Sequence, residues 1–298
     1  MTPFVGLSAF PVTPSDTEGR VDVDHFQRLV SRLVQDGVAS VGALGSTGGY
    51  MYFNPSEKAR AYAAAVEAAG ATPVIAGIGA MHTAEAVANA RAAEAAGAQG
   101  VLLAPVQYMA LTDDEIVGLF SAVTGAIGIP VLIYNAAGKT GISVSEQLIA
   151  RLAATDGVAA VKNPPAPEGD FAGQLARLRI TTPEGFSLGY SGDSSILGAL
   201  RAGADAWYSV LAGTLPEQSA RLWANRRNAA ALAAAAEPLV PLLRTFDAYG
   251  GIRVVHETAL MLDLGTVAPP PPLQPLGPSA RREIEVALEA AMAAEAPA

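Results

Sequence analysis

Residues 70–105, GATPVIAGIGAMHTAEAVANARAAEAAGAQGVLLAP, hold the pattern that decides the fold. An apolar run, Pro73–Gly79, is followed by an alanine-rich stretch, Thr83–Ala96, and then by a second apolar run, Gly100–Pro105. The two runs are short and continuously apolar rather than alternating, which is typical of parallel strands covered on both faces. The stretch between them starts with a threonine and is followed by Gly97, and these are helix start and stop signals. The segment therefore predicts a strand, a helix and a parallel second strand.

The same alternation continues along most of the chain. The apolar runs predict eight strands: Val5–Phe10, Val38–Leu44, Pro73–Gly79, Gly100–Pro105, Ile129–Asn135, Gly157–Asn163, Phe186–Tyr190 and Asp205–Val210. The segments between them predict amphipathic helices: Asp22–Gln35, Ser56–Ala69, Thr83–Ala96, Thr112–Thr124, Ser143–Ala154, Asp170–Leu178 and Ser194–Ala202. Strand and helix repeated eight times favour an α/β fold of the (β/α)8 TIM barrel type. A doubly wound sheet is the alternative, but no dinucleotide-binding fingerprint marks one.

After Pro216 the strand pattern stops. The remaining stretches predict helices at Glu217–Glu237, Pro238–Tyr249, Ile252–Leu264 and Ser279–Ala294, with a stiff proline-rich connector, Ala268–Pro278, before the last of them. We expect a barrel over residues 1–215 and a C-terminal helical extension over residues 216–298 that packs on the barrel.

Composition excludes several classes of protein and site. The 298 residues include no cysteine, which excludes a disulfide scaffold, a zinc–thiolate site, an iron–sulfur cluster and a cysteine nucleophile. A formal net charge of −9 argues against a nucleic-acid partner. No apolar run reaches the ~20 residues of a membrane span, and the N-terminus lacks the basic start and apolar core of a signal peptide. We expect a soluble, cytoplasmic protein with no membrane partner.

The histidines do not suggest a metal site. His25, His82 and His256 lie far apart in the sequence and show no spacing typical of metal ligands. We expect each of them at the surface or at a helix cap.

A lysine lies at the end of the sixth apolar run, and the ends of strands are where barrel enzymes carry their chemistry. The chain has 19 basic residues, of which only three are lysine: Lys58, Lys139 and Lys162. Burial inside an apolar strand would lower the pKa of Lys162, and a neutral amine is a nucleophile that can form a Schiff base with a carbonyl. The alternative is a lysine whose ammonium reaches solvent or pairs with a carboxylate.

Two further strand ends carry candidate groups. Tyr134 lies near the end of the fifth run, where its hydroxyl could move protons beside the amine or its ring could simply fill the barrel. The turn Gly45-Ser46-Thr47-Gly48 follows the second run. Its hydroxyls and backbone N–H groups can hold a carboxylate, although an ordinary strand–helix turn is the alternative.

Together these segments resemble the dihydrodipicolinate synthase / N-acetylneuraminate lyase family of class I Schiff-base aldolases over nearly the whole chain. The motifs that carry the resemblance are the turn Gly45-Ser46-Thr47-Gly48-Gly49, the segment Tyr134–Gly141, Lys162 at the end of the sixth strand, and Ser191-Gly192-Asp193.

The resemblance implies a mechanism. Lys162 would condense with the ketone of pyruvate or of another 2-oxo acid, while the turn holds the carboxylate through Ser46, Thr47 and Gly48. Tyr134 would move protons. The resulting enamine would add to an aldehyde, or would be the product of retro-aldol cleavage. The resemblance implies that no metal or organic cofactor takes part.

The second-substrate site departs from the family pattern. The resemblance places Lys139, Gly192, Asp193 and Tyr208 at this site. Lys139 stands where the synthases have an arginine, and Tyr208 stands where a small aliphatic residue is common. Gly49 also replaces the glutamate that closes the glycine turn. These differences favour an altered second substrate.

Other readings of the same motifs remain open. One is a keto-sugar-acid dehydratase of the same superfamily, similar to 5-dehydro-4-deoxyglucarate dehydratase, and another is a non-catalytic barrel that binds a 2-oxo acid. The resemblance also implies a homotetramer. A homodimer is the alternative, because the family's aromatic pair falls on Val106-Gln107, with Tyr108 one place further on, where family dimers meet.

Overall fold

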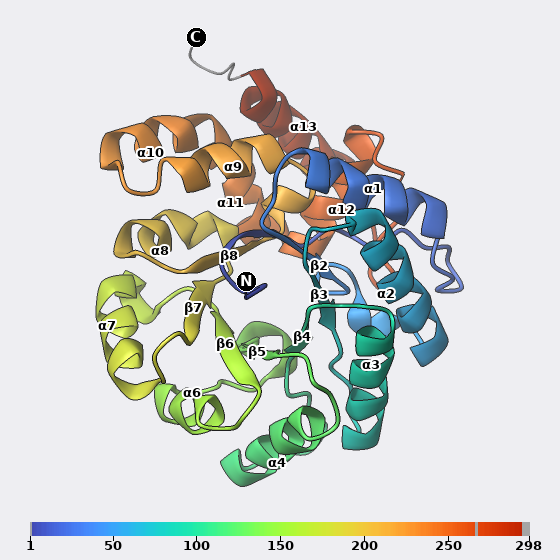
Figure 1. The fold of residues 1–298 in the computed structure, drawn as a ribbon. Coiled ribbons are helices and arrows are strands. Elements are labelled where there is room, and N and C mark those ends of the chain that lie inside the picture. The colour runs from blue at the N-terminus through green and yellow to red at the C-terminus, as the bar shows by residue number, and fades with distance from the viewer. Residues whose placement is uncertain (1, 266–267, 294–298) are drawn as a thin grey trace.

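Eight parallel strands close into a barrel in the order in which they occur along the chain (Figure 1). The computed structural model describes residues 2–265 and 268–293. The strands are β1 (Gly6–Ala9), β2 (Ser40–Ala43), β3 (Val74–Gly77), β4 (Gly100–Leu103), β5 (Val131–Tyr134), β6 (Val158–Asn163), β7 (Ser187–Tyr190) and β8 (Ala206–Ser209). Each lies inside one of the predicted apolar runs, and the (β/α)8 TIM barrel is confirmed.

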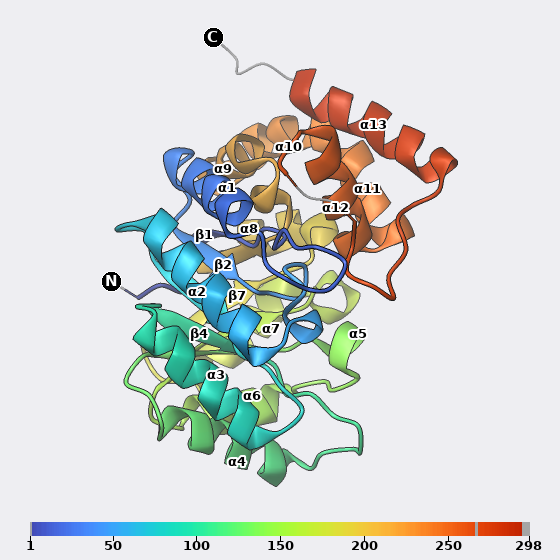
Figure 2. The same cartoon turned by 90° about the vertical axis from the view of Figure 1, so that its right-hand side faces the viewer.

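Helices surround the barrel as an outer ring (Figure 1). They are α1 (Val23–Gln35), α2 (Pro55–Ala69), α3 (Thr83–Ala95), α4 (Asp113–Thr124), α6 (Glu146–Ala153), α7 (Phe171–Thr181) and α8 (Ile196–Ala202). A single helical turn, α5 (Ala137–Thr140), follows β5 at the carboxyl ends of the strands (Figure 2). Short 3-10 turns are η1 (Tyr50–Tyr52), η2 (Pro167–Gly169), η3 (Asp193–Ser195), η4 (Leu211–Gly213) and η5 (Glu237–Leu239). The capping residues act as expected: Thr112 accepts a hydrogen bond from the Glu115 N–H, and the Glu115 carboxylate accepts one from the Thr112 N–H. Only α5, a single turn after β5, was not predicted.

The chain after β8 is helical, as predicted, and covers one side of the barrel (Figure 2). Its helices are α9 (Pro216–Ala224), α10 (Ala229–Ala236), α11 (Val240–Tyr249), α12 (Gly251–Met261) and α13 (Pro278–Ala293). The single helix predicted over Glu217–Glu237 is wrong, because the chain breaks between α9 and α10 and the Asn228 side chain starts α10 by accepting from the Ala231 N–H. In the extension, α13 packs on α11 and α12, while α11 packs on η3 at the barrel. Treating residues 1–215 and 216–298 as two domains stays a prediction.

One segment of the extension is apolar over a considerable length. Within the described residues, Ala229–Tyr249 is long and apolar enough to cross a membrane by length and composition alone, contrary to the expectation that no run has that length. It is made of α10, η5 and α11, and 39% of its most apolar window is buried inside the fold. One such stretch is a weak indication, since helices in the core of a folded protein pass the same test.

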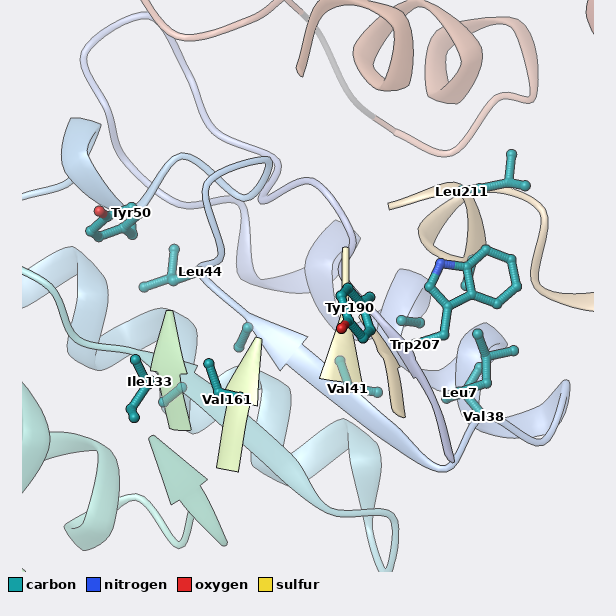
Figure 3. Close-up of a cluster of buried hydrophobic side chains, with 14 of the residues drawn as sticks. Leu7, Val38, Val41, Leu44, Tyr50, Ile133, Val161, Tyr190, Trp207 and Leu211 are labelled. Atoms are coloured by element: carbon teal, nitrogen blue, oxygen red, sulfur yellow. The ribbon is translucent and has the colours of Figure 1, made fainter. Parts of the chain in front are cut away.

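The barrel separates two hydrophobic layers. Alternate side chains of a strand point in opposite directions, so Ile133 and Val161, which are neighbours on β5 and β6, pack outward against the helices (Figure 3). Leu132, Tyr134 and Ala160 belong to a second cluster that fills the inside of the barrel. The inward positions of β5 and β6 therefore supply the candidate catalytic side chains.

Glycines in the strands make room for two aromatic rings inside the barrel. A Cβ atom on Gly42 would overlap the ring of Phe10, and a Cβ atom on Gly189 would overlap the ring of Tyr208. The Phe10 and Tyr208 rings meet edge to face, with centroids 5.9 Å apart and an interplanar angle of 86°. Close approach of these rings to the backbone explains why β2 and β7 carry glycine at inward positions.

We expect Gly42→Ala to lower the free energy of unfolding by about 1–3 kcal/mol, because the Phe10 ring must shift in a packed interior. Urea unfolding measures the change. Gly118→Ala is the matched control: Gly118 is an exposed position in α4 with open space around it, so alanine there should raise stability by about 0.5–1 kcal/mol. Equal unfolding midpoints for Gly42→Ala and the unmodified protein would contradict the packing described here.

Candidate active site

A β-bulge places the candidate lysine beside the candidate tyrosine. The register between β5 and β6 shifts after Val131, which pairs with Val158, so that Leu132 pairs with Ala160 and Tyr134 pairs with Lys162. A shift of one residue exchanges the two faces of a strand, so without this bulge Tyr134 would pair with an outward-facing residue. With it, both side chains point into the barrel from adjacent strands.

The amine of Lys162 is buried among aromatic rings. Lys162 is 2% exposed, and its Nζ atom lies 3.8 Å from the centroid of the Phe10 ring, 4.5 Å from that of Tyr134 and 5.7 Å from that of Tyr208. The alternative in which the ammonium reaches solvent is therefore wrong. Phe10 was not predicted as a site residue, because its role depends on its packing against the nitrogen and not on a reactive group.

Burial changes the acidity of the Lys162 amine. Loss of hydration disfavours the ammonium and lowers the pKa of Lys162 to about 8. The charges of Tyr134 and Asp193 raise this pKa and the charge of Lys139 lowers it, but burial is the largest cause. A usable fraction of neutral amine therefore exists near neutral pH, as nucleophilic attack requires.

Tyr134 connects the amine to the glycine turn. Tyr134 is 4% exposed, and its hydroxyl accepts a hydrogen bond from the Ser46 Oγ at 3.3 Å. Burial acts to raise the pKa of the Tyr134 phenol, but the charges of Lys162 and Lys139 and the Ser46 hydrogen bond outweigh it, so the pKa lies below its ordinary value. Residues predicted separately from β2, β5 and β6 thus meet in one place.

The turn after β2, Gly45-Ser46-Thr47-Gly48, is largely buried. Thr47 and Gly48 are buried, and Ser46 is partly buried. Leu44, at the end of β2, has a φ of 56° in the left-handed region, which is a strained conformation for a branched residue. Strain of this kind is common at functional sites, and here it lies directly before the turn Gly45-Ser46-Thr47-Gly48.

A buried hydroxyl beside this turn is an additional donor that sequence reasoning missed. The Thr13 Oγ1 atom is buried without a hydrogen-bond partner in the described part of the protein. It lies against Gly48, because a Cβ atom on Gly48 would be 3.1 Å from it. A buried hydroxyl with a free donor can serve an anion held by the turn. Thr13 lies just after the first apolar run, and its residue type alone does not distinguish it as a ligand.

The remaining second-substrate candidates lie at different depths. Lys139 is exposed on α5, on the same side of the barrel as the carboxyl ends of the strands (Figure 2), and its charge acts on both Tyr134 and Lys162. The Tyr208 hydroxyl instead donates to the carbonyl of Phe4 at 3.4 Å, before the start of β1. It therefore points toward the amino-terminal end of the barrel, and only its ring approaches the amine.

The carboxylate of Asp193 is fully engaged with β8 and the residue that follows it. Its Oδ1 accepts from the Trp207 Nε1 at 3.0 Å and from the Ser209 Oγ at 2.6 Å, while Oδ2 accepts from the Val210 N–H at 3.2 Å. Burial raises the pKa of the Asp193 carboxyl against these donors. Asp193 thus joins η3 to β8 and fixes the neighbouring Gly192, which has a φ of 89°.

The loop after β4 carries two residues of the region where the sequence departs from the family pattern. Tyr108 is 89% exposed, whereas Gln107 donates to the Gly141 carbonyl and so connects the loops after β4 and β5.

His82 caps α3 as expected, but His256 is buried in α12, and the expected surface position is wrong for it. Over residues 2–265 and 268–293 no group of three or more His, Asp or Glu side chains could hold a metal ion.

Comparison with known proteins agrees with this geometry. The model of the dihydrodipicolinate synthetase family matches residues 3–291. The 4-hydroxy-tetrahydrodipicolinate synthase of Acidiphilium cryptum is 32% identical over 291 residues, which are 96% of this chain and 97% of that one. That of Methylococcus capsulatus is 36% identical over 187 residues, which are 61% of this chain and 62% of that one.

A solved structure shows the same arrangement of the whole chain. The crystal structure of dihydrodipicolinate synthase from Agrobacterium tumefaciens is 45% identical, covers 97% of this chain and 99% of its own, and superposes with a TM-score of 0.95. The chain therefore belongs to the dihydrodipicolinate synthetase family and is an enzyme of the class I Schiff-base lyase type.

Proposed function

We propose that Lys162 is the Schiff-base lysine of an aldolase or lyase that acts on pyruvate or a related 2-oxo acid, similar to dihydrodipicolinate synthase but with a different second substrate. The observation that carries the proposal is the buried Lys162 amine beside Tyr134, whose hydroxyl is bonded to Ser46. Because the chain is a Schiff-base enzyme by family, the non-catalytic alternative no longer applies.

The first step is formation of the imine. The neutral Nζ of Lys162 adds its lone pair to the ketone carbon, and the carbonyl oxygen takes up a proton to give a carbinolamine. Loss of that oxygen as water leaves a protonated imine on Lys162. The Tyr134 ring lies beside the nitrogen, and we assign the proton transfers of both stages to its hydroxyl, which is hydrogen-bonded to Ser46.

The carboxylate of the oxo acid fits the turn after β2. The Thr47 hydroxyl and the backbone at Gly48 supply donors, and the unpartnered Thr13 hydroxyl is a further one. Neutral donors suit this position, because an additional lysine or arginine there would lower the pKa of the Lys162 amine further.

The protonated imine then acts as an electron sink. Loss of a proton from the adjacent carbon gives an enamine, which adds to the carbonyl of an aldehyde, and the reverse sequence cleaves the same bond. We assign Lys139 and Gly192 to the second substrate, whereas Asp193 would act by holding the turn and Tyr208 by limiting the space beside the amine. Lysine lacks the planar fork of the arginine that it replaces, which favours a partner not bound through a bidentate carboxylate.

Assembly and location stay predictions. Five large apolar side chains are exposed on the loops after β2, β3 and β4: Met51, Tyr52, Met81, Tyr108 and Met109. Large apolar side chains left exposed on these loops are a feature of protein interfaces, which supports the proposed homodimer or homotetramer. A cytoplasmic location is retained as an expectation.

We expect borohydride reduction in the presence of pyruvate to add one covalent adduct to the protein, on the peptide that contains Lys162 and not on those containing Lys58 or Lys139. Lys162→Arg and Lys162→Met should both abolish the adduct and turnover, because neither side chain can form an imine. Mass spectrometry locates the adduct, and circular dichroism checks that both variants fold. Turnover in a folded Lys162 variant would remove Lys162 from the mechanism.

A screen of oxo acids and aldehydes identifies the second substrate. Oxo acids are offered with and without aldehydes, and the products are identified by mass. An aldolase or lyase joins or yields two fragments, whereas a dehydratase yields a single product lighter by one water.

The rate of imine formation should depend on pH through the Lys162 amine. Below a pKa of about 8 the neutral fraction falls tenfold per pH unit, so the trapping rate should rise with pH and level off above it. The groups that act on this amine are Tyr134, Asp193 and Lys139. Lys139→Met removes a positive charge and should move the midpoint to higher pH. A rate independent of pH from about 6 to about 9 would contradict the assignment of this pKa.

Tyr134→Phe should reduce turnover by about 10²- to 10⁴-fold, because the group that moves protons is lost while the ring is kept. The free energy of unfolding should change by only about 1 kcal/mol. Tyr190→Phe is the matched control, since its hydroxyl bonds to Gln174 outside the barrel. Steady-state kinetics of the two variants measure the effect of each hydroxyl on turnover. Similar rates for both variants would show that a group other than Tyr134 moves the protons.

A further inference from the structure

We propose that Phe10 is a further catalytic residue: the face of its ring stabilises the positive charge on the Lys162 nitrogen in the protonated imine. The inference rests on the proposed function, because it requires that Lys162 forms the imine. It assigns a role in the chemistry to an apolar side chain that carries no reactive group.

The geometry is that of a cation–π contact. The Lys162 Nζ lies 3.8 Å from the centroid of the Phe10 ring, well inside the ~6 Å range over which a cation is attracted by the electron-rich face of a ring. The rings of Tyr134 and Tyr208 lie further away, at 4.5 and 5.7 Å. Phe10 is therefore the ring that approaches this nitrogen most closely among the three around it.

The protein holds the ring in this position before any substrate arrives. Phe10 is 1% exposed and packs directly on the backbone of β2 and its turn, because Cβ atoms on Gly42 or Gly45 would collide with it. Tyr208 supports it from the side in an edge-to-face contact. A ring confined in this way cannot turn away when the nitrogen acquires its charge.

The chemistry of the nitrogen explains the use of a ring in place of a carboxylate. The same atom must be neutral when it attacks and positive once the imine has formed, and an imine is a weaker base than the amine from which it is made. Burial opposes the charge in both forms. An ionised carboxylate at contact distance would hold the amine as ammonium, and the nearby carboxylate of Asp193 is already engaged by three donors. A ring face attracts the cation more weakly and offers no site for its proton.

The test replaces Phe10 with 4-fluoro-, 3,5-difluoro- and 3,4,5-trifluorophenylalanine. Each fluorine withdraws electrons from the ring face with little change in shape. We expect the affinity for pyruvate, read from the borohydride-trapped fraction at increasing pyruvate, to fall stepwise along the series, by about 2- to 30-fold overall. The Lys162 titration midpoint should move to lower pH in the same order, which a purely structural role of Phe10 would not produce.

Controls separate this effect from packing and from the proposed function. The same analogues at Phe26, a buried ring of α1, should leave trapping unchanged. Phe10→Leu, which keeps an apolar group without the ring face, should resemble the trifluoro protein. Equal affinity and midpoint across the series, with the adduct still on Lys162, would overturn the role of Phe10 and leave the proposed function standing. No adduct on Lys162 even in the unmodified protein would overturn both.

Discussion

Exclusion of water from one amine is the constraint on which this site depends. The Lys162 nitrogen lies inside a closed ring of strands, where loss of hydration disfavours its ammonium form and the three neighbouring aromatic rings compensate only in part. Burial of the amine is possible because the apolar clusters inside and outside the strands stabilise the barrel and hold the side chains around Lys162 in place. Packing therefore sets the acidity of this amine, because a lysine in contact with water would remain an ordinary ammonium.

Each surrounding residue modifies that amine by a different physical route. Tyr134 and Ser46 provide two hydrogen-bonded hydroxyls, Lys139 contributes a positive charge from α5, and Phe10 presents the face of its ring to the nitrogen. Asp193 acts indirectly, because its carboxylate connects η3 to the end of β8 by accepting hydrogen bonds from Trp207, Ser209 and Val210. The extension takes part as well, since the Ser194 hydroxyl beside Asp193 donates to Asp247 of α11 at 2.8 Å.

The strands were predictable because burial on both faces leaves a plain apolar run, and most helices because serine, threonine and glycine mark their ends. The site was predictable only in part. Lys162 and Tyr134 could be found as reactive groups at strand ends, but their adjacency depends on a bulge after Val131 that no local pattern reveals. Phe10 and Thr13 were missed because neither is distinguished by residue type. The break between α9 and α10 and the burial of His256 depend on tertiary packing, which periodicity does not report.

The proposed chemistry depends most directly on the acidity of the Lys162 amine. With only three lysines in the chain, lysine labelled with ¹³C at Cε gives a spectrum simple enough to titrate by NMR, and the signal missing from Lys162→Met identifies residue 162. We expect this signal to titrate with a pKa of about 8, as a buried amine should. A Lys162 signal that titrates near the ordinary value of 10.5 would contradict this expectation, because the amine would then be as well hydrated as one on the surface.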